Sequence, residues 1–243
     1  YWATSARLGV DTAYDTNQMK VGRRLAIKLM NATKFVLSFP TPKADATPTE
    51  RVDLALINRL CALIDETTAA FESYDYARAL ERTESFFWSF CDDYLELVKG
   101  RAYGAQGEEA AASANTTLRL TLSTLQRLFA PFLPFVTEEM WSWWQEGSIH
   151  SASWPASAEL PGGDEGDDVL TAASHVLGEI RRAKSEAKVS QRAAVALVAV
   201  RSDETTIAQL RHVAGDLKGV GSVADLSLEI GDTSVIVELA PPA

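Results

Sequence analysis

A run of basic side chains between residues 20 and 35 is the stretch of this sequence best suited to binding a charged ligand. Neighbouring residues on a helix differ by about 100°, so a helix here would gather these side chains on one face. Ammonium and guanidinium groups neutralise phosphate, an amide can hydrogen-bond a base edge, and a phenyl ring can stack on a base. This combination is typical of a site for single-stranded nucleic acid. The candidate residues are Lys20, Arg23, Arg24, Lys28, Asn31, Lys34 and Phe35.

The charge around this run is opposite to that of the whole chain. The 243 residues carry a formal net charge of −10, but no acidic residue occurs between Asp15 and Asp45. Salt screens charges beyond about 10 Å, so an acidic chain can still carry a local basic site. The same pattern also fits a solvated helix face with one half-buried Phe, and periodicity alone does not separate the two interpretations.

A second basic cluster near the C-terminal end of the chain is weaker. Its cations are interrupted by Glu179 and Glu186, which favours a solvated helix face over a binding site. The cluster consists of Arg181, Arg182, Lys184, Lys188 and Arg192.

The sequence shows no recognisable catalytic or metal-binding arrangement. The three His residues are far apart, and none has a Cys or His at metal-ligand spacing. Adjacent acidic pairs such as Glu138-Glu139 would diverge by about 100° on a helix, so they would not converge on one substrate. Nucleophile elbows, phosphate-binding loops and dinucleotide-binding glycine motifs are missing. We therefore expect no catalytic residue and no metal ligand in this chain.

The helical pattern that positions the basic run continues through most of the chain. We predict a helix over about 17–38 and further helices over about 47–73, 76–101, 108–130 and 134–145. Thr47-Pro48-Thr49-Glu50 is a capping-box signal for the second of these helices. Large apolar residues recur along the third, and we expect Leu80, Phe87, Cys91, Tyr94 and Val98 to be buried.

The pattern changes after the Gly-rich, acidic stretch 161–168. Beyond it we predict a helix over about 168–188, a strand over 193–201, a helix over 203–217, and strands over 223–230 and 234–239. Gly231-Asp232 is a hairpin turn signal between the last two strands. The prediction is thus a mainly α chain, with a helical bundle at 1–160, a linker at 161–168 and a small α+β module at 169–243.

Other features of the sequence indicate where in the cell the protein is located. No apolar run approaches the ~20 residues that a membrane helix needs, and the start of the chain does not have the pattern of a signal peptide. Cys61 and Cys91 form neither a metal motif nor a disulfide framework, so we expect reduced thiols, a cytoplasmic location and no membrane contact. The absence of a starting Met indicates an excised piece of a longer protein.

Three segments resemble the C-terminal half of class I valyl-tRNA synthetases. They are LAIKLMNATKFVL (25–37), FFWSFCDDYLELVKGRAY (86–103), and FAPFLPFVTEEMW (129–141) followed by SIHSASWP. YWATSARLGVD (1–11) and RRAKSEAKV (181–189) are similar to flanking parts of that family, so the resemblance covers essentially the whole chain. The order and spacing are specific for the valine, isoleucine and leucine group, and the details around 25–37 point to valine.

The resemblance implies a fold and a partner. The fold would be the helical bundle that binds the anticodon stem and loop, and the partner would be tRNA(Val). The family's anticodon contacts come mainly from the helix matched by 20–35, which assigns base contacts to Lys28, Asn31, Lys34 and Phe35. Lys34 stands where the family often has Arg, and the two side chains differ in hydrogen-bond geometry.

The resemblance also implies what lies outside this chain. Family members join valine to tRNA with ATP and Mg²⁺ in a nucleotide-binding domain, and neither signature loop of that domain occurs here. We therefore expect no cofactor in this chain, contacts with the catalytic and editing domains of the same parent protein, and a monomer. The chain would carry recognition without chemistry.

Three alternatives remain at this point. One is the same module of an isoleucine or leucine enzyme, although the Cys-rich zinc tail of many isoleucine enzymes is missing. Another is a helical protein-interaction module without affinity for RNA, against which the acid-free run 16–44 argues. The third is an enzyme in its own right.

The residues after 195 lack the sustained heptads of the coiled-coil arm that many valine enzymes carry.

Overall fold

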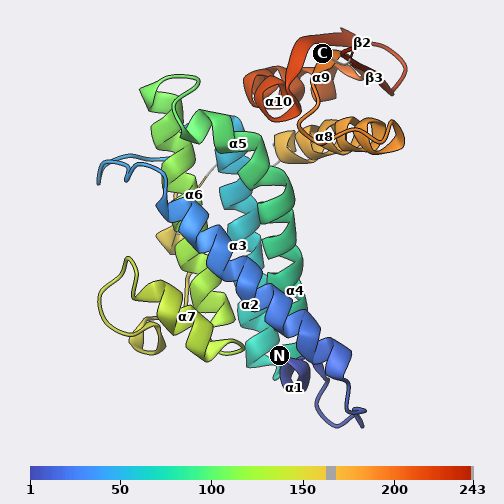
Figure 1. Ribbon diagram of the computed structural model, residues 1–243. Coiled ribbons are helices and arrows are strands. Elements are labelled where there is room, and N and C mark those ends of the chain that lie inside the picture. The colour runs from blue at the N-terminus through green and yellow to red at the C-terminus, as the bar shows by residue number, and fades with distance from the viewer. Residues whose placement is uncertain (163–167, 242–243) are drawn as a thin grey trace. The chain divides into compact units, whose positions relative to one another are not determined.

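The computed structural model describes residues 1–162 and 168–241, and these form two compact units (Figure 1). The first unit contains Tyr1–Asp45, Ile57–Cys91 and Asn115–Gly162. The second contains Ala46–Leu56, Asp92–Ala114 and the described residues after 167. The predicted linker at 161–168 lies mostly outside the described residues, so the domain boundaries given above stay a prediction.

Helices build the first unit. Two of its long helices, α3 and α6, also contribute their first turns to the second unit. The elements are α1 (Trp2–Ser5), α2 (Thr16–Leu37), α3 (Arg51–Glu72), α4 (Tyr76–Ser89), α6 (Glu108–Phe129), α7 (Pro134–Trp141) and the short 3-10 helices η2 (Ile149–Ser151) and η3 (Ser157–Glu159). The predicted mainly α fold with a small α+β segment at its end is confirmed.

Helix α2 begins and ends within one residue of its predicted bounds. The Asp15 carboxylate caps it by accepting hydrogen bonds from the backbone N–H groups of Asn17 and Gln18, at 2.7 and 3.4 Å. Gly22 lets Tyr1 approach closely, because a Cβ there would lie 2.5 Å from the Tyr1 Cβ atom. Helical periodicity predicts that Val21, Leu25, Leu29, Ala32 and Val36 face inward. The last four are buried, whereas Val21 is half-buried.

The predicted capping box of α3 is wrong. The helix begins at Arg51, four residues after the expected cap Thr47. The Ser113 hydroxyl, on α6, accepts hydrogen bonds from the backbone N–H groups of Thr49 and Glu50, at 2.9 and 3.1 Å. A hydroxyl distant in sequence thus satisfies backbone donors near the helix start, a role that local spacing cannot reveal.

The predicted helix 76–101 is interrupted. A π-helical segment, Phe90–Tyr94, joins α4 to α5 (Leu95–Ala102). Its wider turn alters the rotation of the chain, so the buried band does not keep a single helical period through it. The five residues expected to be buried in this region are buried nevertheless: Leu80, Phe87, Cys91, Tyr94 and Val98.

The second unit ends in a three-stranded sheet with helices against it. Its last elements are α8 (Val169–Glu186), β1 (Val195–Ser202), α9 (Glu204–His212), α10 (Ala214–Gly221), β2 (Val223–Ile230) and β3 (Ser234–Leu239). The helix predicted over 203–217 is therefore two helices. The strand order is β2-β1-β3, with β1 parallel to β2 and antiparallel to β3.

The predicted hairpin at Gly231-Asp232 is also wrong, because β2 and β3 both pair with β1 and not with each other. Gly231 donates its backbone N–H to the Ser202 carbonyl at the end of β1, so the connection passes that end of the central strand. A turn signal fixes where the chain bends, whereas strand order depends on which strands pair.

A buried charged cluster holds part of the second unit together. Arg101 is only 2% exposed and lies between Asp53 and Asp216, with closest nitrogen–oxygen distances of 2.7 and 3.0 Å. The hydroxyls of Tyr94 and Ser113 also donate to Asp53, at 2.7 and 2.5 Å. Burial raises the pKa of Asp216 to about 6, although the charge of Arg101 opposes that shift.

Candidate nucleic-acid interface

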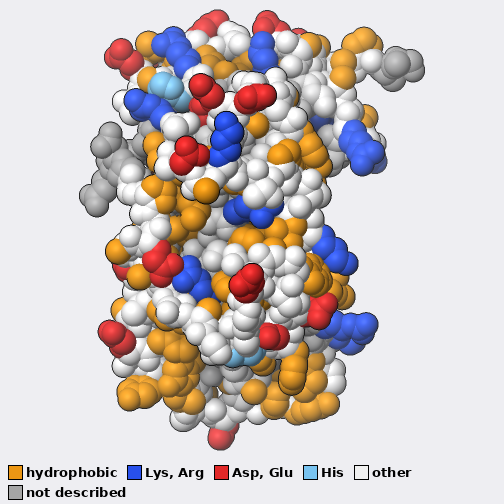
Figure 2. Space-filling view, turned by 90° about the vertical axis from the view of Figure 1, so that its left-hand side faces the viewer, with side chains coloured by type: hydrophobic (Ala, Val, Ile, Leu, Met, Phe, Trp, Pro, Cys, Tyr) orange, Lys and Arg blue, Asp and Glu red, His pale blue; other side chains and the backbone are white. Residues whose placement is uncertain are grey.

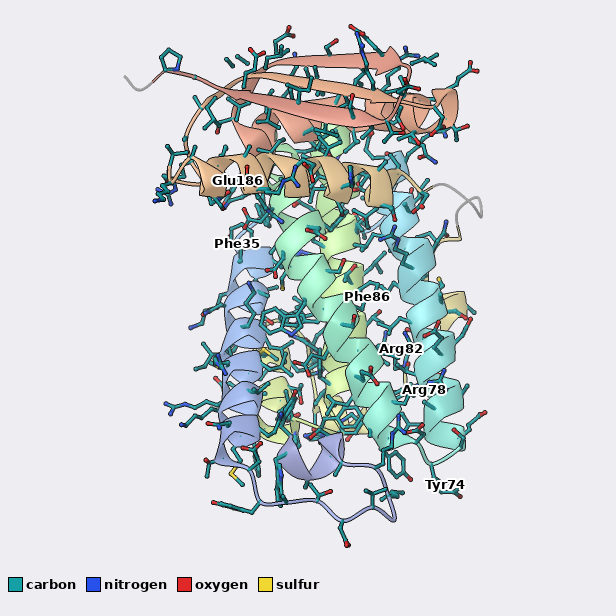
Figure 3. The ribbon with its side chains drawn as sticks, turned by 90° about the vertical axis from the view of Figure 1, so that its right-hand side faces the viewer. Phe35, Tyr74, Arg78, Arg82, Phe86 and Glu186 are labelled. Carbon is teal, nitrogen blue, oxygen red and sulfur yellow. The ribbon has the colours of Figure 1, made fainter. Side chains whose placement is uncertain are left out.

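The seven predicted site residues all lie on α2, within the first unit. Lys20, Arg23, Arg24, Asn31 and Lys34 are exposed. Lys28 and Phe35 are half-buried along one edge of the same face, and Figure 3 shows Phe35 near the C-terminal end of α2. The structure therefore gathers the predicted side chains on one helix, as their spacing indicated.

The middle of this face is open to a ligand. Within the described ranges, Lys20, Arg23 and Arg24 form no ion pair, and the Asn31 amide has no hydrogen-bond partner. Three cations and one amide are thus available to an incoming group without first breaking an internal bond. An exposed amide of this kind can hydrogen-bond a base edge, and exposed cations can meet phosphates.

Phe35 differs from a fully exposed stacking residue. Its ring contacts Phe39 in an edge arrangement, with ring centroids 4.9 Å apart and an interplanar angle of 73°. The side chain is half-buried, so the packing against Phe39 restricts its motion while part of the ring stays accessible. A partly fixed ring loses less freedom on stacking against a base than a mobile one does.

Two tryptophans that are not among the predicted site residues also border this face. The Lys28 ammonium lies 5.6 Å from the ring centroid of Trp88, on α4. The Lys34 ammonium lies 5.5 Å from the ring centroid of Trp143, just after α7. Both distances are within the range of cation–π attraction. In sequence each Trp follows a Glu by four residues, but that spacing does not reveal which lysine meets the ring.

The second basic cluster is occupied by internal bonds. Arg181 pairs with Asp93 at 3.1 Å, and Arg182 pairs with Glu179 at 2.6 Å. Lys184, which was expected on a solvated face, is buried and donates to the Gly221 carbonyl at 2.8 Å. Burial lowers the pKa of the Lys184 ammonium. These contacts give Arg181, Arg182 and Lys184 structural roles in the second unit, whereas Lys188 and Arg192 are exposed.

The surroundings narrow the class of ligand. On the face drawn in Figure 2, Lys and Arg side chains are interspersed with Asp and Glu. Among the described residues, no group of three or more His, Cys, Asp or Glu is placed to hold a metal ion. In the part of the chain that the structure describes, every helix is too short or too polar to cross a membrane. The exposed cations of α2 are groups suited to binding phosphates.

One known protein family matches this sequence over more than half of its length. The family described as the anticodon-binding domain of tRNA ligase matches residues 53–199, which is more than half of the chain. The chain belongs to this family.

Individual relatives narrow the assignment. The valine–tRNA ligase of Salinispora tropica is 50% identical over 259 residues, which cover 98% of this chain and 30% of that protein. The valine–tRNA ligase of Thermobifida fusca is 52% identical over 249 residues, covering 99% of this chain and 28% of that protein. The valine–tRNA ligase of Leifsonia xyli is 46% identical over 245 residues. The chain thus spans less than a third of the length of these relatives.

Proposed function

We propose that this chain recognises the anticodon stem and loop of tRNA(Val) as part of a valine–tRNA ligase. The observation that carries the proposal is the exposed face of α2. There the Asn31 amide, which has no hydrogen-bond partner among the described residues, lies among cations on an acidic chain. The family match and the similarity to valine–tRNA ligases support the same function.

The residues of this face divide into two roles. Lys20, Arg23 and Arg24 neutralise phosphates and set the register of the RNA, which carries no sequence information. Lys28, Asn31 and Lys34 meet base edges, and Phe35 stacks on an unstacked loop base. Valine anticodons share A in the middle and C at the third position. An amide can both accept from and donate to an adenine edge, which makes Asn31 suited to the middle base.

The wider role follows from this assignment. The parent enzyme would join valine to tRNA(Val) with ATP and Mg²⁺ bound in its catalytic domain, and this chain would contribute recognition only. We place that enzyme in the cytoplasm and expect it to be a monomer. The valine ligases reported above favour valine over isoleucine or leucine as the amino acid.

Chemical footprinting of RNA tests the proposal directly. The chain is incubated with a tRNA(Val) transcript, with a tRNA(Val) whose anticodon is altered, and with an unrelated hairpin. We expect protection of the anticodon loop in tRNA(Val), and weaker protection in the other two RNAs. No protection at all, or equal protection of the hairpin, would show that this face does not read an anticodon and would favour a protein-interaction module.

A further inference from the structure

Two tryptophans on different helical segments make the same arrangement beside α2. The Trp88 indole N–H donates to Glu84 at 3.2 Å, and the Trp143 indole N–H donates to Glu139 at 3.0 Å. In each case the glutamate lies one helical turn before its tryptophan, and a lysine of α2 lies over the ring. The indole is thus oriented by one hydrogen bond while its face meets an ammonium group.

The two lysines lie on opposite sides of Asn31. Lys28 and Lys34 are six residues apart, which is about 120° around the helix and about 9 Å along its axis. Asn31 lies midway between them in both senses. The two cation–π contacts therefore bracket the exposed amide, with Lys28 held toward α4 and Lys34 held toward the end of α7.

Internal hydrogen bonds fix this arrangement on the α7 side. The Trp144 indole N–H donates to Gln126 at 3.1 Å, and the Gln126 amide donates to the Thr33 hydroxyl at 3.3 Å. Thr33 and Gln126 are fully buried. Because Thr33 precedes Lys34 and Trp144 follows Trp143, the internal bonds link the two segments whose outer side chains form the cation–π contact.

The Lys28 side is fixed in a similar way. The Tyr1 hydroxyl donates to Glu84 at 2.7 Å, and Glu84 also accepts from the Trp88 indole. Glu84 therefore joins the start of the chain to the ring that contacts Lys28. A lysine on a solvated helix samples many rotamers, and ordering it when RNA binds costs entropy. A lysine held over an indole has lost part of that freedom beforehand.

We propose that Trp88 and Trp143 are positioning residues for anticodon recognition, which hold the Lys28 and Lys34 ammonium groups on either side of Asn31. This inference rests on the proposed function of α2. The N–H donors of these ammonium groups that do not face the rings would meet the RNA. The surface that determines anticodon preference would therefore extend beyond α2 to α4 and to the segment after α7.

Binding measurements on the folded chain test the role of Trp143. Trp143→Leu removes the aromatic face, and we expect it to weaken binding to tRNA(Val) about two- to fivefold, the usual worth of an exposed cation–π contact. Trp143→Phe keeps a face and should retain most of the affinity. In a Lys34→Ala background, Trp143→Leu should have no further effect, because the ring acts through the lysine. Trp88 and Lys28 are tested in the same way.

A matched control and a spectroscopic measurement separate positioning from general packing. Trp154 is also hydrogen-bonded through its indole N–H, to Thr68 at 2.9 Å, so Trp154→Leu controls for loss of a part-buried tryptophan. NMR of lysine labelled at Cε should show ring-current shifts for Lys28 and Lys34 without RNA. The Lys34 shift should disappear in Trp143→Leu. The NMR measurement on the unmodified chain also tests the contacts if a Leu variant does not fold.

Each outcome has a defined meaning. If Lys34→Ala weakens binding but Trp143→Leu does not, the positioning role is wrong while the proposed function stands. If the two effects are additive, Trp143 acts on RNA independently of Lys34, which also overturns positioning. The absence of ring-current shifts in the unmodified chain would overturn the contacts themselves. If neither Lys28→Ala nor Lys34→Ala weakens binding, the proposed function of this face fails, and the positioning role fails with it.

Discussion

At the scale of single residues, the buried pair of carboxylates around Arg101 is a source of pH dependence. One guanidinium faces both Asp53 and Asp216, so the cluster carries one more negative charge than positive when both acids are ionised. Gln106 also donates to Asp216, at 2.7 Å. Burial is the main cause of the raised pKa of Asp216, and the negative charge of Asp53 adds to it, while Arg101 and Gln106 oppose it.

The consequence for stability has a definite sign. The pKa of Asp216 rises from an ordinary value of 3.8 to about 6 in the folded chain, so the folded state binds the proton more tightly than the unfolded state. The free energy of unfolding should therefore decrease, by up to about 3 kcal/mol, as pH rises from 4 to 7. Urea unfolding of the wild-type chain and of Asp216→Asn at several pH values between about 4 and 7 measures this change in the free energy of unfolding. The variant should gain stability relative to wild type as pH rises.

If the difference in stability between wild type and Asp216→Asn stays constant over this pH range, the raised pKa of Asp216 is wrong.

At the scale of elements, Phe87 tests the core of the first unit. Its side chain is 1% exposed, and its ring lies 5.7 Å from that of Phe129 at an interplanar angle of 86°. Phe87→Ala should lower the free energy of unfolding by about 3–5 kcal/mol, because it removes a large apolar side chain and leaves a cavity. Denaturant unfolding measures the loss. Phe135→Ala, at a ring 91% exposed, should change stability by about 0.5 kcal/mol or less.

The sequence predicted what depends on local spacing. The bounds of α2, its inward residues and its basic face follow from helical periodicity, and the strands over 223–230 and 234–239 match β2 and β3. Strand order did not follow, because β1 lies between two strands that are neighbours in sequence.

Contacts between segments that are distant in the sequence could not be predicted either. The Ser113 hydroxyl replaces the predicted Thr47 cap from 64 residues beyond Thr49. The rings over which Lys28 and Lys34 lie come from α4 and from the segment after α7. Periodicity assigns a side chain to a face of its own helix, but it does not say which residue of another helix meets it.

At the scale of the whole molecule, the proposed function requires an acidic chain to bind a polyanion through one local surface. If Arg24 contacts phosphate as proposed, Arg24→Ala should weaken binding to every tRNA by a similar factor. The slope of log affinity against log salt should become shallower by about 0.7–0.9, the value expected for one lost phosphate contact. Titrations at several salt concentrations measure both quantities. Arg201→Ala, which removes a cation paired with Glu229 at 2.9 Å, should change neither.

If α2 reads the anticodon as proposed, the ratio of two dissociation constants should depend on its side chains. One is measured with tRNA(Val), and the other with the same tRNA altered at the middle and third anticodon bases. Because a base-edge contact contributes about 1–3 kcal/mol of discrimination, Lys28→Ala should reduce this preference by roughly fivefold or more. Phe35→Ala should weaken both complexes with a smaller change in the ratio, since stacking tolerates sequence. A Lys28→Ala variant that folds, as judged by circular dichroism, and keeps the wild-type ratio would contradict the account.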